Sequence, residues 1–184
     1  KIVADGGMDG VDAVFGMHGM PIDIGFYDIK PGYRMAGCDT IYVKFEGVSG
    51  HGSSPHLAKD TILPAAEFVT QLNAMITKFV NSQSPLVLTV GKFDAGTKAN
   101  IISKYAKLDI SMRYLEEETR RTIHEKIRNL AAGLAIIYDV KIDVDIEESA
   151  ISMRNDERIA EIANKSAERI FGPNKNVNGP ILMG

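Results

Sequence analysis

Cysteine is almost absent from this chain of 184 residues, and Cys38 is the only one. A single cysteine excludes an internal disulfide framework, and with it the small disulfide-stapled secreted scaffolds. It also excludes a cysteine-rich zinc module. Long hydrophobic runs are lacking as well, because the longest, near Leu134–Tyr138, is far too short to cross a bilayer. We therefore expect no membrane partner.

An excess of one charge sign is also lacking. The chain has 21 lysines and arginines against 24 aspartates and glutamates, a formal net charge of −3. That balance offers no basic surface to nucleic acid or anionic lipid, so neither is an expected partner. The hydrophobic share of 45% and the charged share of 24% are ordinary for a globular protein. The opening residues Lys1–Asp5 do not have the pattern of a signal peptide, and we expect a cytoplasmic location.

Both ends of the sequence suggest a segment of a longer protein. The chain has no initiator methionine and stops at Leu182-Met183-Gly184 without a terminating signal. Residues 1–37 are rich in glycine and short apolar runs. Two of these runs, Val11–Met17 and Ile22–Ile29, predict buried strands. Pro31-Gly32 predicts the turn that follows them.

The middle of the chain alternates strands and helices in a regular order. A period of two residues predicts strands around 41–46, 106–114 and 140–147, and the β-branched, apolar run 86–93 predicts a fourth. Apolar stripes at helical spacing predict helices at about 61–80 and from 116–118 to 137. The order β-α-β-β-α-β predicts an α+β, ferredoxin-like domain, in which two helices cover one face of a four-stranded antiparallel sheet.

A third helix is expected at 155–171, capped by Asn155 or Asp156 and ended by Gly172-Pro173. It belongs to neither half of the β-α-β-β-α-β unit. We therefore expect three segments. Residues 38–150 form one domain, inserted between fragments 1–37 and 151–184 of a second domain.

The four histidines lie in different contexts. His51 and His56 belong to the small-residue loop 47–56, where the backbone can approach a ligand closely. The plain alternative is a flexible exposed loop. His18 follows an apolar run, as a metal ligand or a satisfied core histidine would. His124 stands among charged neighbours on the second helix, and we expect it to be solvated.

Two other polar residues stand out around the third predicted strand. Arg113 projects from the polar face of an expected interior strand. It is either a surface arginine that snorkels to solvent or a fork for a substrate carboxylate. Asn100 precedes that strand, where it can serve a turn or donate an amide hydrogen bond to a ligand.

Taken in order, four motifs form a pattern: Gly16-Met17-His18, Gly50-His51-Gly52-Ser53-Ser54-Pro55-His56, Asn100-Ile101-Ile102 and Met112-Arg113-Tyr114. The set resembles the zinc-dependent aminoacylase/carboxypeptidase metallopeptidase family. The most similar branch is that of hippurate hydrolase and N-acyl-amino-acid amidohydrolase, which includes plant auxin-conjugate hydrolases. The resemblance covers nearly the whole chain, and residues 38–150 match the lid, or dimerisation, domain of that family.

The resemblance implies a role for each matched residue. His18 matches a metal-ligand histidine at a strand end. His51 matches the lid histidine that reaches the active site of the partner subunit and stabilises the tetrahedral oxyanion. Asn100 and Arg113 match lid residues that bind substrate, with Arg113 as the carboxylate clamp. His56 falls on a family histidine that we place with the substrate-binding residues.

The chemistry implied is metal-dependent hydrolysis of the amide bond of N-acyl or N-aroyl amino acids, or of related conjugates. Two divalent ions, zinc or else Mn, Co or Ni, bridge and activate a water, and a glutamate takes its proton. The family's Cys-Gly-His-Asp motif, Glu-Glu pair and last histidine ligand are missing from these residues. We therefore expect this fragment alone to be inactive and to hold no metal.

The expected assembly is a homodimer through the lid domain. Leu86–Val90 is apolar enough to be hazardous as an open sheet edge, so pairing with a second copy is favoured. The rival interpretation is a stand-alone ferredoxin-like module for dimerisation or small-molecule binding, without catalysis.

Overall fold

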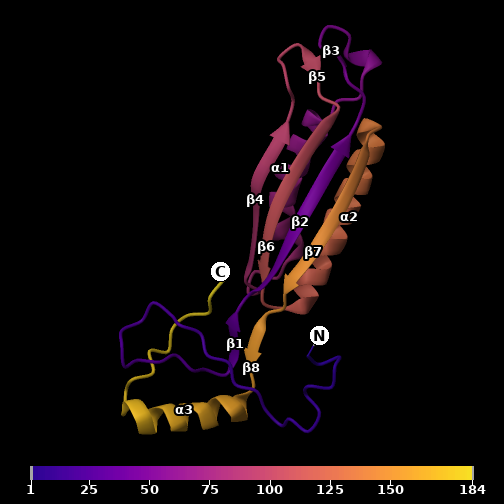
Figure 1. Cartoon of the computed structure of the whole chain (residues 1–184). Coiled ribbons are helices and arrows are strands. Elements are labelled where there is room, and N and C mark those ends of the chain that lie inside the picture. Colours follow the sequence, from indigo (N-terminus) through magenta and orange to yellow (C-terminus); the bar gives the residue numbers. More distant parts are fainter. Residues whose placement is uncertain (1, 184) are drawn as a thin grey trace. The chain divides into compact units, whose positions relative to one another are not determined.

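The computed structural model describes residues 2–183 and divides the chain into two compact units (Figure 1). The first unit combines the residues up to Gly32 with Arg154–Pro180. The second combines Tyr33–Met153 with the residues from Ile181 onward. The boundaries expected from the sequence, at 37/38 and 150/151, stay predictions.

A four-stranded antiparallel sheet with strand order β4-β6-β2-β7 is the frame of the second unit. Its strands are β2 (Gly37–Glu46), β4 (Leu86–Ala95), β6 (Tyr105–Tyr114) and β7 (Lys141–Ala150). The helices α1 (Ile62–Phe79) and α2 (Glu117–Tyr138) lie together against one face of the sheet (Figure 1). The α+β, ferredoxin-like prediction is thereby confirmed.

The core lies between the sheet and these two helices. Alternation along β2 buries Ile41, Val43 and Phe45 completely, while the residues between them face the other side. Phe45 meets Phe68 of α1 edge to face, with ring centroids 5.9 Å apart. Burying each such side chain contributes about 1.5–3 kcal/mol to folding. The period-two pattern in the sequence therefore corresponds directly to the packing.

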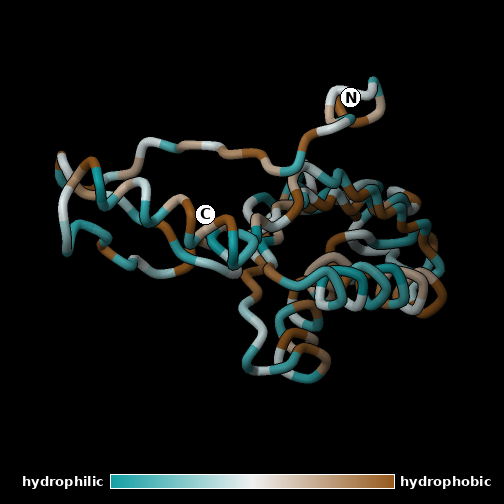
Figure 2. The backbone as a smooth tube through the Cα atoms, turned by 90° about the horizontal axis from the view of Figure 1, so that it is seen from below, coloured by the Kyte–Doolittle hydropathy of each residue, from teal (hydrophilic) through white to brown (hydrophobic). Residues whose placement is uncertain are grey.

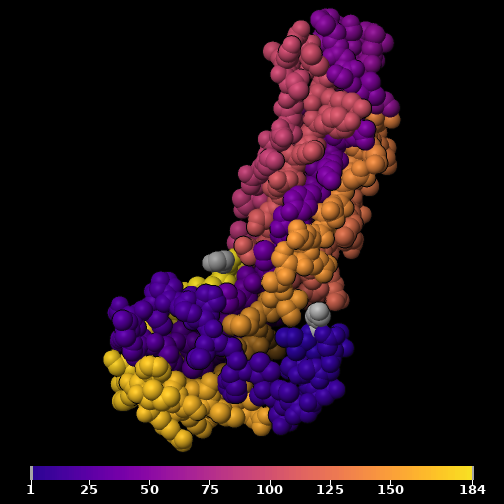
Figure 3. Space-filling model, viewed as in Figure 1, coloured from indigo at the N-terminus to yellow at the C-terminus, as the bar shows by residue number. Residues whose placement is uncertain are grey.

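Three short elements form at the end of the second unit where β2 finishes and β6 begins. They are β3 (Gly50–His51), β5 (Ile101–Ile102) and the 3₁₀ helix η1 (Pro55–Leu57), and β3 pairs with β5 in a sheet of its own. We call residues 47–59 and 96–104 the tip. Figure 3 shows these two segments, purple and pink, lying together at one end of the second unit.

The opposite end of the second unit is where β6 finishes and α2 begins. We call the side chains gathered there the base, and they are Asp39, Tyr114, Glu117, Arg120, His124 and Glu148. The strands β1 (Gly32–Met35) and β8 (Met153–Asn155) form a further two-stranded sheet.

The first unit contains the expected third helix, α3 (Glu157–Phe171). The Asp156 carboxylate accepts the Ile159 N–H at 3.0 Å and so caps the start of the helix, and Gly172, with a φ of 87°, follows its last residue as the C-cap. No helix among the described residues has the length and hydrophobicity needed to cross a membrane.

The strands expected at Val11–Met17 and Ile22–Ile29 are wrong, because neither segment forms a strand. Figure 2 shows hydrophobic positions in the stretch that follows the N-terminus, and Val14 and Phe15 are exposed. A strand needs a neighbour for its backbone groups, and the one contact of this kind described here is an isolated bridge between Tyr27 and Asn176. Apolar composition alone therefore gave a false strand signal.

Candidate functional site

The tip brings His51 and Asn100 together from distant parts of the sequence. His51 pairs with Ile101 in the β3–β5 ladder, and the Gly52 N–H donates to the carbonyl of Asn100 at 2.9 Å. The Ser49 hydroxyl donates to the carbonyl of Ile102 at 3.0 Å. Two backbone pairings and a side-chain bond thus hold the two loops against each other.

Small residues are needed where the tip segment 47–59 folds back on itself. A Cβ on Gly47 would lie 2.1 Å from the carbonyl oxygen of Lys59, and one on Gly50 would lie 2.7 Å from the Cβ of Ala58. The close approach at Gly47 permits two backbone hydrogen bonds between Val48 and Lys59, at 3.0 and 2.9 Å. The glycines of this loop therefore allow tight packing and paired backbone groups, rather than providing a loose linker.

The His51 side chain is exposed and is bonded within its own loop. Its Nδ1 lies 2.7 Å from the Ser53 hydroxyl, and the Ser53 backbone N–H donates to the same nitrogen at 3.3 Å. His56 is exposed on η1, a few residues further along the tip.

Arg113 lies at the far end of its strand from the tip. It is next to the fully buried Met112 on β6 and pairs with Cys38 of β2 and Val87 of β4, so β6 is the interior strand that the sequence predicted. Eight residues separate it from Tyr105 at the tip end of β6, which is about 26 Å at ~3.3 Å per residue. A single chain therefore brings His51 and Asn100 together but holds Arg113 apart from them.

The base contains a buried charge cluster that sequence reasoning missed. The Asp39 carboxylate, 0% exposed, accepts both Nε (2.8 Å) and Nη2 (3.1 Å) of Arg120 and the Nε2 of His124 (2.8 Å). Arg120 also pairs with Glu148 at 2.7 Å and lies over the Tyr114 ring at 5.2 Å. This network joins α2 to strands β2, β6 and β7.

The expectation of a solvated His124 is wrong, since only 7% of the residue is exposed. The physical reason is Asp39, which follows the same alternation as Ile41 and Val43 and so enters the core face of β2. A carboxylate there requires cationic or hydrogen-bonding partners, and α2 supplies Arg120 and His124 one turn apart. The signal available in the sequence was the position of Asp39, which falls in the same alternation as Ile41 and Val43 and so indicates a buried carboxylate.

Electrostatics at the base favour a neutral histidine. Burial lowers the pKa of His124 below its usual 6.5, against the opposing effect of the Asp39 charge. The bond to Asp39 raises the pKa of Arg120, so the guanidinium stays charged and balances the carboxylate. His124 therefore donates its Nε2 hydrogen to Asp39 as a neutral imidazole.

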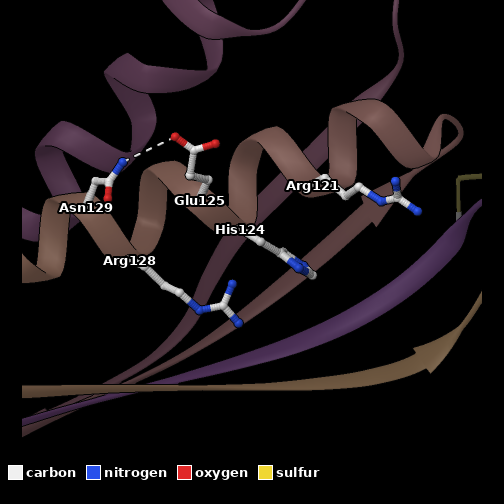
Figure 4. A pocket seen from close by; sticks show the side chains of 5 residues that line it. All are labelled: Arg121, His124, Glu125, Arg128 and Asn129. Atoms are coloured by element: carbon white, nitrogen blue, oxygen red, sulfur yellow. Dashed lines mark hydrogen bonds between the residues drawn. The ribbon is translucent and has the colours of Figure 1, made fainter.

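A shallow pocket opens beside His124 on the surface of α2. Figure 4 shows Arg121 and Arg128 on either side of this histidine, whereas Glu125 and Asn129 leave another side of the helix and bond to each other at 3.4 Å. Arg121 is engaged by Glu117 at 3.2 Å. The pocket therefore adjoins the buried cluster through His124, which lines it.

The predicted metal ligand His18 is exposed, and its Nδ1 bonds to the carbonyl of Gly19 at 2.7 Å. Nowhere in residues 2–183 do three or more histidine, cysteine or carboxylate side chains gather as a metal centre would require. The described residues do not by themselves fit a dinuclear site.

Comparison with known proteins places this architecture in context. The family profile described as "Peptidase dimerisation domain" (M20_dimer) matches residues 35–139, more than half of the chain. The hippurate hydrolase of Campylobacter jejuni is 37% identical over 164 residues, which cover 88% of this chain and 42% of that protein. The N-acetyldiaminopimelate deacetylase of Ligilactobacillus salivarius is 32% identical over 152 residues, 82% of this chain and 40% of that protein.

Solved structures agree with the sequence relatives. An aminohydrolase structure from methicillin-resistant Staphylococcus aureus superposes with a TM-score of 0.84 at 31% identity, covering 91% of this chain and 45% of that one. A dinuclear metal-binding M20 peptidase from Bacillus subtilis has a TM-score of 0.76 at 24% identity over 100% of this chain and 45% of its own, which supports the shared fold. The chain spans about two fifths of the length of the curated relatives it matches.

Proposed function

Because the chain belongs to the peptidase dimerisation domain family of the M20 peptidases, we propose that it is the lid domain, with flanking strips of catalytic domain, of a metal-dependent amidohydrolase. The complete protein cleaves the amide bond of N-acyl or N-aroyl amino acids. Relatives named as a hippurate hydrolase and as deacetylases of N-acetylated amino acids support this substrate class. Its two metal ions, zinc in our proposal, bind in the catalytic domain, where His18 is one ligand.

The separation of the tip from Arg113 is the observation that supports this function most directly. His51 and Asn100 lie at the tip, and Arg113 lies about 26 Å by strand rise from Tyr105, which marks the tip end of β6. One substrate a few ångströms across cannot touch both ends of the same chain. We therefore assign His51 and Asn100 to the active site of the partner subunit, and Arg113 to the site of its own subunit.

Each assigned side chain has a distinct task. His51 donates a hydrogen bond to the oxyanion that develops as water attacks the acyl carbonyl. Arg113 binds the substrate carboxylate through its planar fork, in both the ground state and the transition state. Asn100 and His56, on the same tip as His51, bind the substrate.

The family supports a homodimer, and the two edges of the sheet differ in a way that selects the interface. The edge strand β7 presents Lys141, Asp143, Asp145 and Glu147 on its outer face, a charged pattern that resists pairing. The edge strand β4 exposes Val87 and Phe93 instead. We assign the two-fold contact to β4 and the adjoining helix α1.

Kinetics of the complete protein test this assignment. His51→Ala should lower kcat by about 10²–10³ with little change in KM, because the lost donor acts on developing charge. Arg113→Ala should instead raise KM more than it lowers kcat, because the clamp acts in both states. An unchanged kcat in His51→Ala would favour the plain alternative for this loop, a flexible exposed segment without a catalytic role.

Subunit mixing tests the trans arrangement. His51→Ala and the metal-ligand variant His18→Ala should each be inactive, yet their mixed dimers should recover part of the activity after subunit exchange. Each mixed dimer would then contain one site with an intact metal ligand and an intact partner histidine. Absence of recovery, with exchange verified by tagged subunits, would show that His51 acts within its own subunit or not at all.

A further inference from the structure

Two contacts in the tip, both from Ser53, indicate which nitrogen of His51 carries hydrogen. The backbone N–H of Ser53 donates to Nδ1 of His51 at 3.3 Å. A backbone amide can only donate, so Nδ1 must offer its lone pair. In the neutral ring the hydrogen then lies on Nε2. The Ser53 hydroxyl, 2.7 Å from Nδ1, is a second donor to the same nitrogen.

The surrounding turn keeps Ser53 in place independently of its side chain. The Ser54 N–H donates to the carbonyl of His51 at 2.9 Å, which closes a four-residue turn with Ser53 at its third position. The Gly52 N–H is bonded to Asn100. Since these backbone bonds fix the turn, removing the Ser53 hydroxyl should leave the loop folded.

We propose that Ser53 is a positioning residue, which holds the His51 ring with Nδ1 toward its own loop and Nε2–H available to a ligand. This rests on the proposed function of His51, because an oxyanion can be stabilised only by a nitrogen that carries a hydrogen. Ser53 touches neither substrate nor metal in this arrangement. It acts by restricting the tautomer and the ring rotation of the exposed histidine.

Imidazole nitrogen NMR on the 184-residue chain tests the tautomer without any need for activity. Long-range proton–nitrogen correlations of neutral His51 should show Nδ1 as the acceptor and Nε2 as the protonated nitrogen. Ser53→Ala removes the shorter of the two bonds to Nδ1 and leaves only the longer backbone bond, so it should move the spectrum part of the way toward a mixture of tautomers. Ser53→Thr, which keeps the hydroxyl, should restore it. Ser54→Ala is the matched control and should change nothing. A protonated Nδ1 in the unsubstituted chain, or no response to Ser53→Ala, would overturn the proposal.

Kinetics of the complete protein then separate this proposal from the one it rests on. A hydrogen bond is worth about 1 kcal/mol, so Ser53→Ala should lower kcat about fivefold, with KM unchanged and activity restored in Ser53→Thr. If His51→Ala lowers kcat while Ser53→Ala does not, the positioning role is wrong and the catalytic role stands. If the NMR result holds while His51→Ala leaves kcat unchanged, Ser53 does set the tautomer and the proposed function is wrong.

Discussion

The tip and the base of the second unit each contain a histidine with one polar partner, yet their surroundings are opposite. His51 is exposed, bonds to a serine hydroxyl, and lies in a frame of glycines and paired backbone. His124 is 7% exposed and bonds to a carboxylate that is itself fully buried. The first arrangement leaves a ring nitrogen available to a ligand, whereas the second uses the ring to satisfy a charge inside the protein.

The comparison shows that a histidine's partners say more about its role than its neighbours in sequence. Both histidines are followed by polar or small residues, and only the fold shows which one is enclosed. At the base, Asp39 and Arg120 are both shielded from water and bonded to each other, so the loss of either side chain leaves an uncompensated buried charge. At the tip, loss of the side chain exposes nothing new.

The largest expected effect is a difference in the free energy of unfolding between a variant at the base and a variant at the tip. Asp39→Ala should lower the free energy of unfolding by about 3–5 kcal/mol, because Arg120 stays buried without its main partner. His51→Ala should change the same quantity by less than about 0.5 kcal/mol, as an exposed substitution. Urea unfolding of the 184-residue chain, followed by circular dichroism, measures both. Similar losses in the two variants would show that the tip is as structural as the base.

A backbone change at the tip should have an intermediate and local effect. Gly47→Ala places a Cβ against the Lys59 carbonyl, so the loop must shift at a cost of about 1–3 kcal/mol. Hydrogen exchange should show lost protection at the amides of Val48 and Lys59, which bond across this contact, while amides in β2 keep theirs.

Gly91→Ala is the matched control for that change. Its Cβ would meet only the Asp109 carbonyl, at an ordinary 3.9 Å. Protection at Val48 and Lys59 should therefore stay as in the unsubstituted chain. Equal protection in both glycine variants would mean that the close approach at Gly47 does not hold the tip together.

Periodicity predicted the sheet and both of its helices because burial imposes it directly. The alternation of Ile41, Val43 and Phe45 follows from one face of β2 being packed and the other wet. The same pattern could not name the partners of Asp39, since Arg120 and His124 come from a helix about eighty residues later. Which charged groups meet across a core depends on how the helices pack on the sheet, and a local sequence pattern does not contain that information.

The residues assigned to the candidate site stay predictions, and their arrangement in space could not be predicted from the sequence. Composition marked 47–56 as a loop that admits a ligand, but the two-residue pairing of β3 with β5 depends on contacts made only after the sheet has formed. The distance between Arg113 and His51 likewise follows from strand direction, which a list of motifs does not give. The N-terminal strand predictions failed for the complementary reason, because an apolar run without a paired neighbour has no sheet to join.

The smallest expected effect is on the pH dependence of the free energy of unfolding, and it again distinguishes His124 from His51. Burial lowers the pKa of His124 in the folded chain below 6.5, so the unfolded chain binds the proton more readily. The stability that depends on neutral His124 is therefore fully present above about pH 6.5. It is lost as the pH falls from 6.5 toward the lower pKa of the folded chain.

His124→Gln keeps an amide that can donate to Asp39 and removes this titration. The charged groups that face the ring are Asp39, Arg120 and Arg128, and all three are retained in the variant. The free energy of unfolding, measured at intervals between about pH 5.5 and 7.5, should rise with pH in the unsubstituted chain and rise less steeply in the variant. His51→Ala should keep the full slope, because His124 remains. If instead His124→Gln keeps the full slope, the buried histidine is not the group that couples protons to folding, and the distinction drawn between base and tip rests on Asp39 and Arg120 alone.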